Sequence, residues 1–346
     1  MHEASHTGNA TQLKLWNTSS LTSQRTIVLI PLFNDWEAAE LLLADLDRAL
    51  ADLSISPEVL FINDGSSLPM PQGFANRQFT ALHSVDVLEL RRNLGHQRAI
   101  AVGLVFVYQS LPSTAVVVMD GDGEDRPGDI PLLADEFYRA GQRSIIFAAR
   151  AKRLERLSFR ALYHLYRVIH LLLTGDQVRV GNFSMVPFES LAKLVVVPEI
   201  WNHYAAAAIR SRLAFRSIPI SRGRRLVGKS KMNFIALLLH GLSAFFVYGD
   251  IVGARLLIAI ALALIVEVIL VAAGVAVWFT TSPNIVVLAA YVAAILGILL
   301  LQAIPVALIL VFTVIGSRVN AGFLPLRDCP YFVSSVQRVF PAYEHY

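Results

Sequence analysis

Apolar and polar positions alternate in two distinct ways along the first two hundred residues. Short apolar runs rich in β-branched residues predict strands at 26–31, 58–62, 85–90, 115–119 and 144–148. Longer stretches with apolar residues at helical spacing lie between them and predict helices at 36–53 and about 95–109. Strands separated by helices predict an α/β domain with a doubly wound, mostly parallel sheet. Ligands of such sheets bind beyond the carboxyl ends of the strands.

A different pattern begins at residue 256. The 61 residues of 256–316 contain one charged residue, Glu267, and a polar break at 280–284. The first half, 256–279, would form about 36 Å of helix, which exceeds the roughly 30 Å hydrocarbon core of a bilayer. We therefore predict two membrane spans joined by a turn, with Glu267 facing the other helix, another subunit or a wet cleft. A buried helical hairpin in a soluble core is the alternative.

The flanks of this stretch suggest an orientation. Arg and Lys residues lie before and after the two spans, while the connecting turn has none. By the positive-inside rule, both termini and the α/β domain are expected on the cytoplasmic side of an inner or plasma membrane. An apolar and aromatic run between 232 and 250 is too short to span and predicts interfacial helices lying on the bilayer.

Composition supports this division. Apolar residues make up 55% of the 346-residue chain and charged residues only 16%, against roughly 25% in soluble domains. The single cysteine excludes an intramolecular disulfide framework, and a net charge of +4 does not indicate a nucleic-acid partner. The predicted parts are a disordered tail at 1–24, a catalytic domain at 25–232, interfacial helices at 233–254, membrane helices at 255–280 and 284–316, and a cytoplasmic tail at 317–346.

Four carboxylates follow the predicted strand at 115–119. Asp120, Asp122, Glu124 and Asp125 fall within six residues and would repel one another unless a cation sits among them. Oxygen ligands favour Mg2+ or Mn2+, which would also bind substrate phosphates. An acidic loop can instead be a solvated turn, but Asp64 follows a neighbouring strand and would lie at the same edge. The pattern therefore favours a metal site for a diphosphate-bearing substrate.

Several segments together resemble a known family. In chain order they are 30–35 (IPLFND), 63–67 (NDGSS), 92–99 (RNLGHQRA), 120–127 (DGDGEDRP), 181–184 (GNFS) and 228–231 (GKSK), followed by the two apolar spans. These motifs resemble family 2 glycosyltransferases with a GT-A fold, and the last ones narrow the resemblance to polyprenyl-phosphate glycosyltransferases. Two positions depart from the family pattern: Asn63 replaces the usual Asp, and Glu124 stands where Gln is common.

The resemblance implies an inverting transfer of one sugar from a nucleotide-sugar donor to a polyprenyl phosphate of the undecaprenyl or dolichyl type, with Mg2+ or Mn2+. It implies that Asp64 helps to bind the base of the nucleotide, that Asp120 and Asp122 hold the sugar nucleotide and the metal ion, and that Glu124 completes the coordination shell of the metal. The expected catalytic residues are Asp122, Asp125, Arg150 and Arg160. The expected substrate-binding residues are Pro31, Asn34, Asp64, Asp120, Arg150, Lys229, Ser230 and Lys231.

Basic residues on two separate segments fit an anionic acceptor at the bilayer. Arg150 and Arg160 are expected to meet Lys229 and Lys231 around the lipid phosphate, since guanidinium groups bind phosphate bidentately. They would otherwise contact anionic lipids of the leaflet. Two other functions stay open: a glycosyltransferase acting on a glycan or protein hydroxyl, and a non-catalytic scaffold in glycan assembly. Assembly into a homo-oligomer is also left open.

Overall fold

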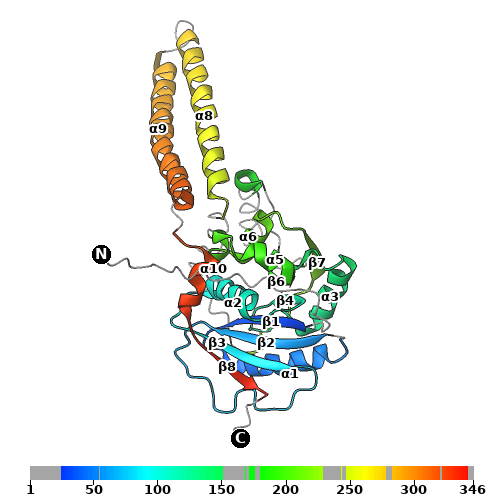
Figure 1. Ribbon diagram of the computed structural model, residues 1–346. Coiled ribbons are helices and arrows are strands. Elements are labelled where there is room, and N and C mark those ends of the chain that lie inside the picture. Colours follow the sequence, from blue (N-terminus) through cyan, green and yellow to red (C-terminus); the bar gives the residue numbers. More distant parts are fainter. Residues whose placement is uncertain are drawn as a thin grey trace, which may run out of the picture.

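A mixed eight-stranded sheet forms the centre of the α/β domain in this computed structural model (Figure 1). The structure describes residues 25–53, 55–150, 168, 171–175, 180–228, 243, 247–277, 283–319 and 322–341. The strand order is β7-β5-β6-β4-β1-β2-β3-β8. The pairs β1–β2, β1–β4, β2–β3 and β5–β7 are parallel, whereas β4–β6, β5–β6 and β3–β8 are antiparallel. The predicted α/β class with a mostly parallel sheet is confirmed.

The strands are short and apolar, as their sequences predict. They are β1 (Arg25–Leu32), β2 (Ser56–Asn63), β3 (Ser84–Leu90), β4 (Ala115–Val118), β5 (Ile145–Arg150), β6 (Val180–Pro187), β7 (Phe215–Ile220) and β8 (Val333–Phe340). The helices of the domain are α1 (Trp36–Leu50), α2 (His96–Ser110), α3 (Ile130–Arg139), α5 (Phe188–Leu194), α6 (Tyr204–Arg210) and α10 (Pro325–Asp328), with 3-10 turns η2 (Pro127–Asp129), η3 (Pro198–Trp201) and η4 (Cys329–Phe332).

Two hydrophobic layers cover the sheet. Side chains at alternate positions of β1 enter opposite layers: Val28 and Ile30 pack with α1 and α3, while Ile27 and Leu29 pack with α2, α5 and α6. All four side chains are fully buried. This alternation follows from the two-residue period of a strand, and burial on both faces explains why the strands read as continuous apolar runs.

Two long apolar helices project together from one side of the domain (Figure 1). They are α8 (Gly249–Val277) and α9 (Pro283–Val319), and each contains a stretch long and apolar enough to cross a membrane. In the most apolar 18-residue stretch of each helix, 0% of the residues of α8 and 6% of those of α9 are buried in the structure. The two helices therefore do not form the buried hairpin of a soluble core. Glu267 faces α9, because a Cβ at Gly297 would lie 3.0 Å from its Oε1.

Helix α8 begins earlier than its predicted start at 255. Its first turns, from Gly249, occupy the end of the stretch predicted as interfacial helices at 233–254, and most of that stretch lies outside the described residues. The predicted disordered tail at 1–24 also lies outside them.

The segment after the hairpin is not a separate tail in the structure, although the sequence suggested one at 317–346. Residues 325–340 return to the α/β domain as α10, η4 and β8, and β8 pairs antiparallel with β3 at the sheet edge. Cys329 is fully buried in this packing, and Arg338 Nε donates to Asp86 Oδ1 at 2.9 Å. The pairing of β8 with β3 and the buried Cys329 thus join the returning segment to the domain.

Candidate active site

The residues with the expected chemistry gather at one edge of the sheet. The parallel strands β1, β2, β3 and β4 all end there, and the chain continues into loops that begin at Phe33, Asp64, Arg91 and Met119. Because carboxyl ends of parallel strands meet at the same edge, polar residues from four distant segments become neighbours. The sequence pattern predicted this convergence.

Asp64 holds one of these loops in place. Its Oδ1 accepts the backbone N–H of Leu94 at 2.7 Å, and its Oδ2 accepts that of Gly95 at 2.8 Å. The side chain is buried, and this burial raises the pKa of Asp64 although the two N–H groups oppose the shift. Both carboxylate oxygens therefore organise the loop in front of α2, and the predicted contact of Asp64 with the nucleotide base stays a prediction.

The acidic loop after β4 is ordered by its own carboxylates. Asp125 Oδ2 accepts the backbone N–H of Asp120 at 2.9 Å, and Asp122 Oδ1 accepts that of Glu124 at 3.0 Å. Asp125 thus closes the loop on itself. Its observed contact suits a positioning role in the loop, and its predicted part in catalysis stays a prediction.

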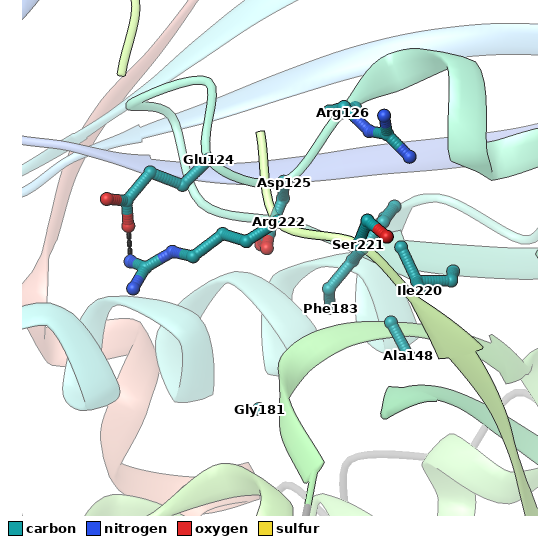
Figure 2. A pocket seen from close by; sticks show the side chains of 9 residues that line it. All are labelled: Glu124, Asp125, Arg126, Ala148, Gly181, Phe183, Ile220, Ser221 and Arg222. Atoms are coloured by element: carbon teal, nitrogen blue, oxygen red, sulfur yellow. Dashed lines mark ion pairs between the residues drawn. The ribbon is translucent and has the colours of Figure 1, made fainter. Parts of the chain in front are cut away.

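A second loop, residues 221–228, folds over this acidic loop. Arg222 forms an ion pair with Glu124, as Figure 2 shows, and Arg225 Nη2 lies 2.6 Å from Asp122 Oδ2. Backbone hydrogen bonds from Gly223 to Glu124 and from Leu226 to Asp122 join the two loops. The guanidinium groups reduce the repulsion among the carboxylates.

Close backbone approach makes this pairing of loops possible. A Cβ at Gly223 would lie 2.6 Å from the carbonyl oxygen of Gly123, and a Cβ at Gly123 would lie 2.4 Å from Leu226 Cγ. Neither position has room for a side chain without displacing its neighbour. The small pocket between the loops is lined by Glu124, Asp125, Arg126, Ala148, Gly181, Phe183, Ile220, Ser221 and Arg222 (Figure 2).

Asp120 contacts residues of α2 and β6. His96 Nε2 lies 3.0 Å from Asp120 Oδ1, and Asn182 Nδ2 donates to the same oxygen at 3.4 Å. Loss of hydration lowers the pKa of His96, but the charge and hydrogen bond of Asp120, with the charges of Asp122 and Asp125, outweigh it and raise the pKa above its ordinary value. His96 and Asn182 therefore orient Asp120.

The acidic residues offer carboxylate oxygens, which are the ligand atoms that a divalent cation such as Mg2+ prefers. Their surroundings also accommodate positive charge, because the chain itself places Arg225 at Asp122 and Arg222 at Glu124. Within the part of the chain that the structure describes, no three carboxylates or imidazoles converge as a metal cage. Asp120, Asp122 and Glu124 stay the predicted ligands; in the structure Asp122 pairs with Arg225 and Glu124 with Arg222.

Other predicted residues have structural contacts of their own. Asn34 has a positive φ of 56°; its Nδ2 donates to Ser67 Oγ at 2.9 Å, and its Oδ1 accepts the backbone N–H of Leu68 at 2.9 Å. Pro31 lies within β1, and its carbonyl oxygen lies 3.3 Å from the place of a Cβ at Gly121. Arg150 is the last residue of β5. The predicted Arg160, Lys229, Ser230 and Lys231 lie outside the described residues.

Four residues of this site were absent from the predicted set: His96, Asn182, Arg222 and Arg225. A signal for the arginines existed in the basic run at 222–225, which flanks the predicted membrane spans and also made Arg225 a weaker candidate for contact with the acceptor phosphate. Asn182 belongs to the segment 181–184 (GNFS), which contributed to the family resemblance, but no role was predicted for this residue. No spacing rule links these positions to Asp120 or Asp122, because the contacts join segments 62 and 103 residues apart.

We expect Glu124→Gln to retain the sugar transfer that the resemblance implies within about fivefold, with an altered preference between Mg2+ and Mn2+. A glutamine keeps an oxygen that can accept from Arg222, and a partly exposed ion pair contributes only about 0–1 kcal/mol. Initial rates with each metal would check this. Complete inactivation would show that the negative charge itself is required.

The chain matches a known sequence family over much of this domain. Residues 27–195 match the family described as Glycosyl transferase family 2. An undecaprenyl-phosphate 4-deoxy-4-formamido-L-arabinose transferase of Klebsiella pneumoniae is 27% identical over 226 residues, which cover 62% of this chain and 64% of that protein. The enzyme of the same name from Erwinia tasmaniensis is 25% identical over 225 residues, covering 62% and 65%. The chain thus matches less than two thirds of the length of these relatives.

Among solved structures, a glucosyl-3-phosphoglycerate synthase from Mycobacterium tuberculosis, in complex with Mn2+, uridine-diphosphate-glucose and phosphoglyceric acid, aligns with a TM-score of 0.49 at 14% identity. The alignment covers 67% of this chain and 81% of the synthase chain. The sequence matches carry the assignment. Residues 27–195 thus match a glycosyltransferase family 2 domain, and relatives of the chain bear the name of undecaprenyl-phosphate sugar transferases.

Proposed function

We propose that this protein transfers a single sugar from a nucleotide-sugar donor to a polyprenyl phosphate at the cytoplasmic face of a membrane. The observation that carries the proposal is the attachment of an apolar helical hairpin to a family 2 domain whose carboxylates gather at one sheet edge. The names of the relatives support a polyprenyl-phosphate acceptor. Among the described residues, the hairpin is the feature that favours an acceptor held in a membrane.

In the proposed reaction, an oxygen of the acceptor phosphate attacks the anomeric carbon of the donor sugar. The bond from that carbon to the diphosphate breaks, and its electron pair leaves with the nucleoside diphosphate, which inverts the anomeric configuration. A phosphate monoester, with a second pKa near 6, is already largely deprotonated at neutral pH. No strong general base is therefore needed, which agrees with the role of Asp125 in closing its own loop.

The chain's own groups would bind and orient the two substrates. Bound Mg2+ or Mn2+ would act as a Lewis acid toward the charge that develops on the leaving diphosphate. Asp120, oriented by His96 and Asn182, and Asp122 are the side chains that would hold it. Arg222 and Arg225 place two further positive charges at the same loop.

The proposal is tested by incubating the purified protein with radiolabelled nucleotide sugars, Mg2+ and polyprenyl phosphate in vesicles. We expect nucleoside diphosphate release that depends on the lipid phosphate, and an acid-labile product that extracts into organic solvent. A product that stays with a glycan or protein would identify a hydroxyl acceptor instead. No metal-dependent release with any donor would favour the scaffold function.

The proposed orientation gives a separate prediction. A topology reporter inserted between residues 280 and 284 should lie on the periplasmic or luminal side of the membrane, and reporters at either terminus should lie in the cytoplasm. The reason is that basic residues flank the hairpin, whereas its turn has none. Cysteine accessibility to an impermeant reagent would check this. Labelling of the turn from the cytoplasm would contradict the proposed topology.

A further inference from the structure

We infer that helix α6 sets the position of the Asp120 carboxylate relative to the bilayer, with Arg210 as the positioning residue that joins it to α8. The inference rests on the proposed function, because it concerns an acceptor held in a membrane. The juxtaposition behind it is that α6 lies between the sheet and the lower end of α8 (Figure 1).

The first end of α6 is tied to the candidate active site. The backbone N–H of Tyr204 donates to Gln97 Oε1 at 2.7 Å, and Gln97 Nε2 donates to Asn182 Oδ1 at 3.1 Å. Asn182 in turn donates to Asp120. The hydroxyl of Tyr204 also lies 2.7 Å from Ser184 Oγ in a fully buried contact. Hydrogen bonds thus connect the beginning of α6 to the acidic loop.

The second end of α6 is tied to the start of α8. Arg210 Nη2 lies 2.8 Å from Asp250 Oδ1, and its Nη1 donates to the carbonyl of Val247. The guanidinium carbon lies 5.6 Å from the centre of the Tyr248 ring, within cation–π range. The Arg210 side chain is only 17% exposed. Several partners thus hold one guanidinium group in one orientation, which a lysine could not reproduce.

Apolar packing stiffens the same junction. Ala206, on α6, packs in a buried cluster with Val247, Tyr248 and Val252 at the base of α8. Tyr248 is only 1% exposed, although it borders the apolar hairpin. Arg255, one turn further along α8, donates to the carbonyl of Leu172 at 2.8 Å. The first turns of α8 are therefore part of the catalytic domain's packing.

Through these contacts, α6 fixes the distance between the candidate active site and the start of α8. Its seven residues span about 9 Å between the Tyr204 and Arg210 ends, and a short helix transmits position with little bending. The tail of a polyprenyl phosphate stays in the bilayer, since exposing it costs about 0.8 kcal/mol per CH2. The acceptor phosphate is then confined to headgroup depth, and the domain must present Asp120 at a matching height.

The test compares Arg210→Gln with Arg212→Gln, which alters an exposed arginine two residues further along. Each variant is assayed with a long-chain polyprenyl phosphate in vesicles and with a water-soluble phosphate of two isoprene units. We expect Arg210→Gln to lose at least about tenfold in kcat/KM on the vesicle-held acceptor, because small misplacements of reacting groups have large effects on rate. On the soluble acceptor, kcat/KM should change less than about twofold, and Arg212→Gln should change neither.

A second variant and a second measurement separate this role from simple misfolding. Asp250→Asn removes the charge from the other side of the junction and should shift the ratio of the two kcat/KM values in the same direction. A fluorophore on Gly128→Cys, where a Cβ meets no atom within 4 Å, would report the distance of the site from a headgroup quencher. The native Cys329 is buried, and burial raises the pKa of its thiol to about 12, so it does not compete for the label.

Each outcome bears on a different claim. Equal losses on both acceptors would overturn the inference, because Arg210 would then support the domain as a whole. Unchanged rates on both, or an unchanged quenching distance in Arg210→Gln, would also overturn it. Failure of the wild-type protein to use either acceptor would contradict the proposed function itself.

Discussion

Asp122→Asn should lower sugar transfer by about 10²–10³-fold, the range typical for removing one group that stabilises charge in a transition state. Asp122 is one of the predicted cation ligands, and its Oδ2 also accepts a hydrogen bond from Arg225 Nη2 at 2.6 Å. The substitution removes the negative charge while keeping the size of the side chain. Initial rates in saturating Mg2+ measure the effect, and near-wild-type turnover would exclude Asp122 from the metal and diphosphate site.

The loss should come from chemistry and not from unfolding. Asp122 and Arg225 are both partly exposed, so their ion pair contributes at most about 1 kcal/mol to stability. The Tm should therefore change by less than about 4 °C. Asp135→Asn is the matched control, because Asp135 is an exposed carboxylate on α3. It should leave both rate and Tm unchanged.

Gly65→Ala should destabilise the catalytic domain by about 3 kcal/mol or more, by combining backbone strain with overpacking. Gly65 has a φ of +63°, and a Cβ there would lie 2.5 Å from the carbonyl carbon of Arg92 and 2.5 Å from the backbone nitrogen of Asn93. The two loops cannot separate without breaking the hydrogen bonds of Asp64 to Leu94 and Gly95. Both stability and donor binding should fall.

Two other glycines separate the contributions to this effect. Gly73 also has a positive φ, of +81°, but a Cβ there would approach no atom closer than 3.8 Å, so Gly73→Ala should cost only about 1 kcal/mol. Gly128 has neither feature, and Gly128→Ala should be close to neutral. Thermal unfolding of the three variants would show the order. A Gly65→Ala protein as stable as Gly73→Ala would mean that the loop at 92–93 yields easily.

Local patterns were sufficient for part of the fold: they predicted β1 to β5, α1, α2 and the two long apolar helices, but not β6, β7, β8 or the shorter helices α3, α5, α6 and α10. The β-branched run at 26–31 and the helical spacing at 36–53 depend on neighbours a few residues away, so the sequence alone predicted β1 and α1. The apolar length of 256–316 likewise predicted a helical hairpin, because spanning a bilayer imposes a length that composition reveals. Asp64 and the acidic loop could be assigned to one sheet edge from topology alone.

The tertiary structure decided which side chains contact which. The return of β8 to the sheet edge, the pairing of Arg225 with Asp122 and the contact of Arg210 with Asp250 each join segments far apart in the chain. Such contacts depend on the packing of whole elements, and neither periodicity nor spacing encodes them. Asp64 shows the same limit: its position was predictable, but its hydrogen bonds to Leu94 and Gly95 arise only where β2 and the loop after β3 meet.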